Sequence, residues 1–242
     1  MAARLYGNPG SHPTFAAELM LRHKGVDYER TDLPQYLHRA MLRLLRFRGA
    51  TVPALVLEDG RRVQTTRRIA RALEQLRPEP PLLPGDPERR ARVEAAEEWA
   101  DGEFQQLARR MTYWALRRDG TTLTSYLEGS NLLFPRWMVT PAAPVIIRIL
   151  ARDHDSTDPA IRQDVADLPR MLDRIDAWIA DGLLGAEPPN VADFQVATTV
   201  ALLRTHDALR PAIDARPAGA LAQRLAPRLP GRTTVAFPGA PG

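Results

Sequence analysis

The sequence predicts two domains, an α/β domain of about 80 residues followed by an all-helical domain. Strand and helix patterns alternate from residue 3 to residue 76. Prolines then recur between residues 78 and 87, where they interrupt both regular periodicities, and only helical patterns follow. The chain has 242 residues, of which 44% are hydrophobic, and this is enough to bury a core in each domain.

The first domain is recognised by its turns and helix ends. The turn at 8–10 ends a short apolar strand, and Ser11 stands at the start of a helix that Gly25 ends. Asp59-Gly60 separates two β-prone runs, which is a strong hairpin signal. The expected elements are a strand at 3–7, a helix at 11–25, a strand at 26–33, a helix at 35–47, a hairpin of 54–58 and 61–64, and a helix at 66–76. This order is typical of a thioredoxin-like domain.

The second domain contains only helical patterns. Helices are expected at 88–117, 144–152, 159–180, 191–207 and 218–225, whereas 120–131 and the tail should be irregular. The predicted fold is an α/β N-terminal thioredoxin-like domain plus an all-α C-terminal helical domain. Its parts are a thioredoxin-like domain at 1–77, a Pro-rich linker at 78–87, a helical domain at 88–229 and a Pro/Gly-rich tail at 230–242.

The composition excludes several kinds of site. The chain contains no cysteine, so disulfides, thiolate metal sites and a cysteine nucleophile are impossible. The net charge of +4 arises from interspersed acids and bases, so we expect no nucleic-acid partner. Asp153, His154 and Asp155 are adjacent and do not converge, so we interpret them as a solvated end and expect no metal. Without an apolar run of signal-peptide or membrane-span length, the sequence predicts a cytoplasmic protein with no membrane partner.

Three segments, taken in order, resemble the glutathione S-transferase superfamily over nearly the whole chain. They are the opening strand and loop from Leu5 to Ser11, the segment from Thr51 to Gly60, and the helix start from Asn190 to Ala197. The helix beginning at Thr66 is similar to the one that follows the hairpin in that family. The resemblance implies the glutathione S-transferase fold with a serine-type loop, a homodimer, and glutathione or another low-molecular-weight thiol as co-substrate. It also implies conjugation to a small hydrophobic electrophile, as in detoxification, and the arginine-rich composition fits a bacterial source.

Ser11 is the first candidate for the active-site hydroxyl. A helix start offers free backbone N–H groups and the positive end of the helix dipole, which stabilise a thiolate that the hydroxyl can donate to. Tyr6 matches the tyrosine that some classes of the family use, although a strand tyrosine also suits a core position. His12 replaces a proline common there in the family, and it suits either a second donor or a helix cap.

Five residues match the thiol-binding positions of the family. Val52-Pro53 would be a cis peptide, with the Val52 backbone pairing to the cysteinyl group of the thiol. Thr66 corresponds to the serine that binds the γ-glutamyl carboxylate, at a helix N-terminus suited to an anion. Thr65 stands where the family has Glu or Gln and offers no carboxylate to the ammonium group, although Gln64 is close enough in sequence to reach it. Both threonines also suit plain helix caps.

The electrophile pocket is expected on the first long helix of the second domain, where Met111, Tyr113 and Trp114 lie. Further aromatic and methionine side chains follow in the loop at 134–138. Packing between helices explains each of these side chains without a ligand, so that alternative stays open.

Two functions of different classes follow from these patterns. The first is a thiol transferase that stabilises a bound thiolate and directs it to an electrophile. The second is a non-catalytic ligand-binding or protein-interaction module that keeps the fold and has lost the cofactor site, which Thr65 favours.

Overall fold

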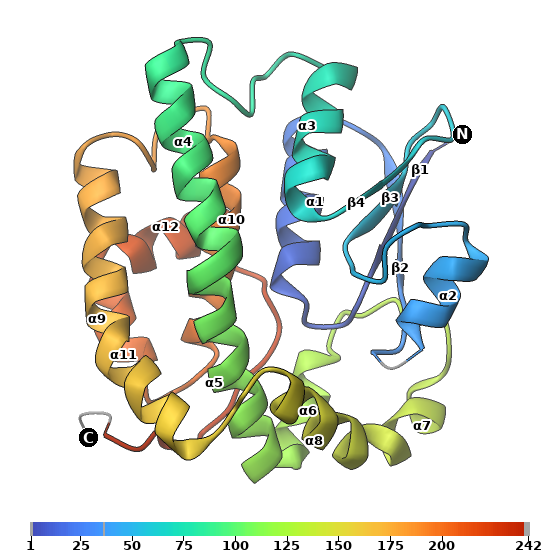
Figure 1. Cartoon of the computed structure of the whole chain (residues 1–242), viewed down its shortest axis with the longest axis vertical. Helices are drawn as coiled ribbons and strands as arrows, with labels where there is room; N and C mark the ends of the chain where they lie inside the picture. Colours follow the sequence, from blue (N-terminus) through green and yellow to red (C-terminus); the bar gives the residue numbers. More distant parts are fainter. Residues whose placement is uncertain (1, 36, 240–242) are drawn as a thin grey trace.

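The protein consists of two lobes, which the computed structural model describes for residues 2–35 and 37–239. In Figure 1 the sheet and the helices that pack on it form one half of the molecule, and a bundle of helices forms the other half. The N-terminal lobe contains β1 (Ala3–Gly7), α1 (His12–His23), β2 (Tyr28–Asp32), α2 (His38–Leu44), β3 (Ala54–Val56), β4 (Arg62–Gln64) and α3 (Thr66–Leu76). The helical lobe contains α4 (Pro87–Trp99), η1 (Ala100–Phe104), α5 (Gln105–Arg118), η2 (Gly120–Thr122), α6 (Leu123–Tyr126), α7 (Arg136–Val139), η3 (Thr140–Ala142), α8 (Ala143–Asp153), α9 (Asp158–Ala180), α10 (Val191–Arg204), α11 (Arg210–Asp214) and α12 (Pro217–Leu225).

The N-terminal lobe is built on a four-stranded mixed sheet in the order β2-β1-β3-β4. Strand β1 runs parallel to β2 and antiparallel to β3, and β3 pairs with β4 as the expected antiparallel hairpin. Alternate residues of β1 face opposite sides, so Leu5 joins the main core while Tyr6 joins a smaller cluster with Leu42 and Phe47. Helices α1 and α3 cover the face of the sheet that is turned toward the helical lobe, and α2 lies on the other side of the sheet (Figure 1). The thioredoxin-like prediction is confirmed.

Helix α10 is the central helix of the molecule. Every residue from Val191 to Leu203 is buried, and the helix packs against α1 of the N-terminal lobe as well as α4 and α12. Its start is a capping box, in which the Asn190 side chain accepts the N–H of Asp193 and the Asp193 carboxylate accepts the N–H of Asn190. The segment from Asn190 to Ala197 therefore has a folding role.

The expected helix at 88–117 is divided by a π-helical turn. Helix α4 passes into α5 through η1, Ala100–Phe104. Trp99 and Phe104 are five residues apart, and their rings stack with centroids 5.1 Å apart and planes inclined by 8°. The wider π-helical turn, with its i→i+5 hydrogen bonds, lets these two rings meet, and the contact has no signal in a pattern of period 3.6.

The only lysine of the chain fastens the connection between the lobes. The Lys24 side chain is fully buried, and its ammonium group donates to Glu74 at 2.5 Å and to the carbonyls of Arg77 and Pro78 at 2.7 and 3.0 Å. Glu74 in turn accepts the N–H of Leu82 at 2.9 Å. The Pro-rich connection is therefore packed against the N-terminal lobe rather than free.

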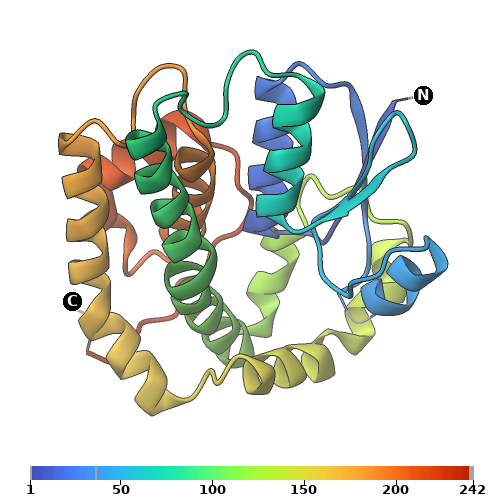
Figure 2. The same ribbon diagram turned by 45° about the horizontal axis from the view of Figure 1, so that its top comes forward.

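The segments expected to be irregular contain more order than their composition suggests. The short helix α6 lies within 120–131, and the C-terminal tail packs on the helical lobe, where Phe237 stacks on Trp114 at 5.3 Å. Residues 131–133, which we call the strap, cross to the N-terminal lobe and form a parallel bridge between Leu132 and Asp32 of β2. The chain around the strap and α7 runs beside β2 and α2 in both views (Figures 1 and 2). Within the described residues, no helix is long and apolar enough to cross a membrane.

Candidate active site between the lobes

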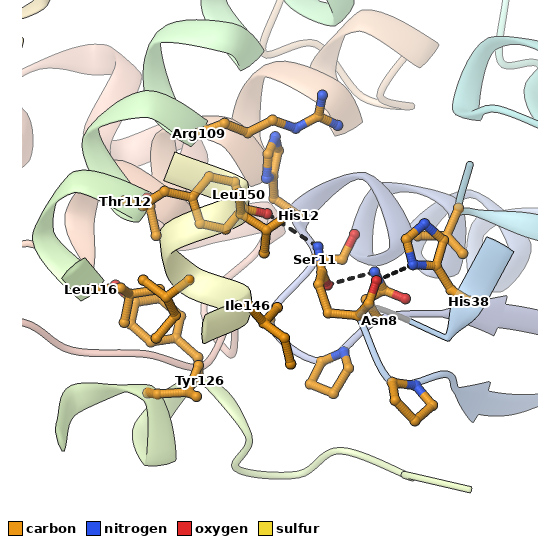
Figure 3. A pocket seen from close by; sticks show the side chains of 18 of the residues that line it. Asn8, Ser11, His12, His38, Arg109, Thr112, Leu116, Tyr126, Ile146 and Leu150 are labelled. Carbon is orange, nitrogen blue, oxygen red and sulfur yellow. Dashed lines mark hydrogen bonds between the residues drawn. The ribbon is translucent and has the colours of Figure 1, made fainter. Parts of the chain in front are cut away.

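A cavity of about 430 Å³ lies between the two lobes. The N-terminal lobe contributes the loop after β1, the segment before α2 and the segment before β3, whereas α5, α6, α8 and the strap form the opposite wall. Figure 3 shows the Ser11 loop on one side and Arg109, Thr112, Leu116, Ile146 and Leu150 on the other. Of the predicted site residues, the cavity brings together Ser11, His12, Val52 and Tyr113.

Ser11 caps α1 from the wall of the cavity. Its side-chain oxygen accepts the N–H of Thr14 at 3.4 Å and the hydroxyl of Thr14 at 3.0 Å. Because this oxygen receives both hydrogens, the Ser11 hydroxyl hydrogen is available to a ligand. The backbone N–H of His12 has no acceptor among the described residues, and Pro13 has no N–H. The helix start thus presents two donors and the positive end of its dipole.

His12 lies next to Ser11 in the wall and is buried, with an exposed fraction of 3%. Burial and the positive charge of Arg109 hold the pKa of the His12 imidazole well below its ordinary value. The ring is therefore neutral near pH 7. Its Nε2 atom has no hydrogen-bond partner in the part of the chain that the structure describes.

A chain of polar side chains connects the lobes across the cavity. The side-chain amides of Asn8 and Gln35 share a hydrogen bond of 2.6 Å, and Gln35 Nε2 donates to the Tyr113 hydroxyl at 3.2 Å. The Tyr113 ring stacks on His154, with centroids 5.0 Å apart. Sequence analysis missed Asn8, Gln35 and His154 as wall residues. His154 was expected at a solvated end, whereas its ring is held against Tyr113 because α8 ends at the mouth of the cavity.

Helix α5 presents one face to the cavity. The lining residues on this helix follow helical spacing and are Arg109, Thr112, Tyr113 and Leu116. Met111 is fully buried in the core, and Trp114 points to the opposite side, where its Nε1 donates to Asp158 at 2.8 Å. These two side chains do not line the cavity, since consecutive helical positions turn by about 100°. Among the loop residues, Trp137 and Met138 are exposed and lie outside the cavity wall.

The predicted thiol-binding residues do not all reach the cavity, since Pro53, Gln64, Thr65 and Thr66 are not among the described residues that line it. Val52 lines it, and the Val52-Pro53 peptide is cis, as predicted. The Gln64 side chain is occupied, since it accepts the N–H of Gly49 at 2.7 Å and donates to the carbonyls of Gly49 and Thr51 at 3.1 Å each. Thr65 has a positive φ of 72° and makes no side-chain cap, and Thr66 is buried at the first turn of α3.

Tyr6 is buried beneath the site rather than at its surface. Its ring meets the edge of Phe47, with centroids 6.0 Å apart and planes inclined by 75°. Tyr6 is not among the residues that line the cavity, so Ser11 is the better placed of the two predicted hydroxyls. No group of three or more His, Asp or Glu side chains in the described ranges is arranged to hold a metal ion.

Comparisons with known proteins agree with this architecture. Residues 5–81 match the family described as glutathione S-transferase, N-terminal domain. A glutathione S-transferase from Rhodospirillum rubrum is 23% identical with a TM-score of 0.65, and the match covers 93% of this chain and 88% of that one. Glutathione S-transferase I from maize, solved with an atrazine glutathione conjugate, is 18% identical with a TM-score of 0.63, over 94% and 93% of the chains.

A glutathione S-transferase from Methylobacterium radiotolerans, solved with glutathione sulfonate, is 18% identical with a TM-score of 0.55, over 98% of each chain. No curated protein sequence matches the chain. Residues 5–81 therefore match a glutathione S-transferase N-terminal domain, and the chain has the two-domain fold of these solved structures.

Proposed function

We propose that this protein is a thiol transferase that conjugates glutathione, or another low-molecular-weight thiol, to an electrophile held in the cavity between the lobes. The observation that carries the proposal is Ser11, which presents a free hydroxyl hydrogen at the start of α1, on the cavity wall. The thiol would lie along the N-terminal lobe, with its sulfur near Ser11 and its backbone near Val52.

The transfer reaction requires that the sulfur of the thiol be ionised and oriented toward the electrophile. The Ser11 hydroxyl, the His12 N–H and the α1 dipole each favour a thiolate over a thiol, so they lower the pKa of the bound thiol. The sulfur then forms a bond to an electrophilic carbon. In a substitution the leaving group departs with its electron pair, and in an addition the neighbouring carbon takes a proton from water. The neutral His12 ring adds no charge to this site.

The test is Ser11→Ala, with Thr157→Ala as its matched control. Both side chains cap a helix through a 3.4 Å bond to a backbone N–H, but Thr157 starts α9 and lies outside the cavity wall. We expect Ser11→Ala to lower kcat by about 10- to 1000-fold with little change in thiol affinity, because the hydroxyl interacts chiefly with the thiolate. Ultraviolet absorbance of the bound thiolate should show its pKa rise. Equal turnover of both variants and wild type would remove Ser11 from the mechanism.

A second candidate function has its own support in the predicted thiol-binding residues 64–66. Thr65 carries no carboxylate, and Gln64 is already bound to the backbone of Gly49 and Thr51, so neither is free to pair with a γ-glutamyl ammonium group. This arrangement favours either a thiol other than glutathione or a non-catalytic ligand-binding or protein-interaction module. Calorimetric titration with glutathione and other cellular thiols separates the two, because the module should bind none of them. Pairing as a homodimer, a cytoplasmic location and a role in detoxification stay predictions of the sequence.

A further inference from the structure

Arg109 is an arginine without a partner in the wall of the cavity. Within the described ranges, its guanidinium group forms no hydrogen bond and no salt bridge, although the side chain is only partly exposed. Two other arginines of α5 are paired, since Arg110 binds Asp164 at 2.6 and 2.8 Å and Arg118 binds Asp158 at 2.6 Å, and the remaining one, Arg117, is exposed to solvent. A guanidinium group removed from water is normally compensated by an anion, so Arg109 stands out on its own helix.

The surroundings of Arg109 supply no internal anion in contact. Its neighbours are His12, Tyr113 and His154, and the acid that interacts with it, Asp101, forms no salt bridge with it; Asp153 lines the same cavity and forms none either. Burial lowers the pKa of the guanidinium, while Tyr113 and Asp101 partly offset this. In Figure 3 the Arg109 side chain extends over the His12 ring, whose Nε2 atom is also unpartnered. The Arg109 guanidinium group and an unpartnered imidazole nitrogen therefore meet at one end of the cavity.

Much of the same wall is apolar. The helical lobe lines it with Leu116, Leu127, Ile146, Ile147 and Leu150. We propose that Arg109 binds the carboxylate of the electrophile, so that the cavity selects acids with an apolar body over neutral compounds of the same shape. This inference rests on the proposed transferase function and names its substrate class. Planar carboxylates fit the guanidinium fork through two parallel hydrogen bonds.

Carboxylate binding is tested without catalysis, by calorimetric titration with phenylbutyrate and its neutral partner phenylbutyramide. We expect the wild-type protein to bind the acid about tenfold or more tightly than the amide, because a charge-assisted pair forms at a guanidinium group that is largely withdrawn from water. Arg109→Gln should abolish that preference, and Arg109→Lys should retain part of it. Arg117→Gln is the matched control, since Arg117 is exposed on the same helix outside the cavity and its loss should leave the preference unchanged.

Equal affinity of wild type for acid and amide would overturn the proposal, and this result needs no variant to fold. A preference that survives in Arg109→Gln would overturn it as well. The carboxylates of glutathione are the other source of the same chemistry, so the titration is repeated with saturating glutathione. If phenylbutyrate still binds in the presence of saturating glutathione, Arg109 is available to the electrophile. If Arg109→Gln loses affinity for glutathione but keeps its affinity for phenylbutyrate, the assignment of Arg109 to the electrophile is refuted.

A kinetic arm keeps the two proposals separate. With glutathione as thiol, kcat/KM for bromomethylbenzoate should exceed that for its methyl ester in wild type, and Arg109→Gln should remove the difference after correction for the spontaneous reaction. If no electrophile is turned over, the transferase proposal fails, while the acid and amide titration still decides whether Arg109 binds carboxylates.

Discussion

The position of Ser11 depends on a close approach between Gly7 and Thr14, which a single methyl group would disrupt. An ideal Cβ atom on Gly7 would lie 2.2 Å from Thr14 Cγ2 and 2.8 Å from Thr14 Oγ1. Ordinary contacts begin at 3.4 Å, so in Gly7→Ala these buried atoms must separate by about 1 Å within a close-packed interior. We expect Gly7→Ala to lower the free energy of unfolding by about 1–3 kcal/mol, as overpacked cores do.

The cause can be isolated with a double-mutant cycle measured by urea unfolding. Thr14→Ala removes both atoms that clash and withdraws the hydrogen bond that the Thr14 hydroxyl donates to Ser11, so alone it should lower stability by about 1–2 kcal/mol. The double variant should be more stable than the sum of the single losses predicts, by about 1–2 kcal/mol. Strict additivity would refute the steric explanation, as would Gly7→Ala with wild-type stability.

Two further predictions concern stability. Lys24→Met leaves Glu74 and two carbonyl groups without their buried donor, so thermal unfolding should show the free energy of unfolding lowered by about 3 kcal/mol. A decrease below about 1 kcal/mol would contradict the anchoring role of Lys24. Burial lowers the pKa of His206 from 6.5 to about 3, so below pH 6.5 the unfolded chain takes up a proton that the folded chain does not. The free energy of unfolding should therefore fall toward pH 3 by about 1.4 kcal/mol per pH unit from this group, and His206→Gln should lose that part of the slope in urea unfolding. Parallel pH profiles for both proteins would count against it.

Much of the fold was predictable because its signals are local. Element ends in the first lobe are marked by the turn after β1, by Gly25 and by Asp59-Gly60. The start of α10 is marked by the capping box at Asn190. The π-helical turn and the order of the tail were not predictable, because both depend on contacts between side chains. Phe237, for example, is fixed by stacking on Trp114, more than a hundred positions earlier in the sequence.

The candidate site was predictable on its N-terminal side and less so on the helical side. Ser11, His12 and Val52 follow turns and helix starts whose geometry is local. On α5, Met111 and Trp114 were predicted with Tyr113 because of their residue types, but only Tyr113 lies on the helical face that lines the cavity. Spacing from Tyr113 alone indicates Arg109 and Leu116 on the same face, four residues before it and three after it. Gln35 and His154 carried no such signal, because they meet Tyr113 only after the lobes pack.

The strap has a consequence for solubility. Strand β2 is an edge of the sheet, and exposed edges are templates for pairing with other chains. Residues 131–133 cap one end of this edge, where the Asp32 N–H donates to the Asn131 carbonyl at 2.8 Å and Leu133 donates to Asp32 at 3.0 Å. Asn131 Nδ2 also donates to the Arg30 carbonyl at 2.6 Å. The crossing that closes one wall of the cavity therefore also occupies backbone groups through which two copies of the sheet would otherwise aggregate.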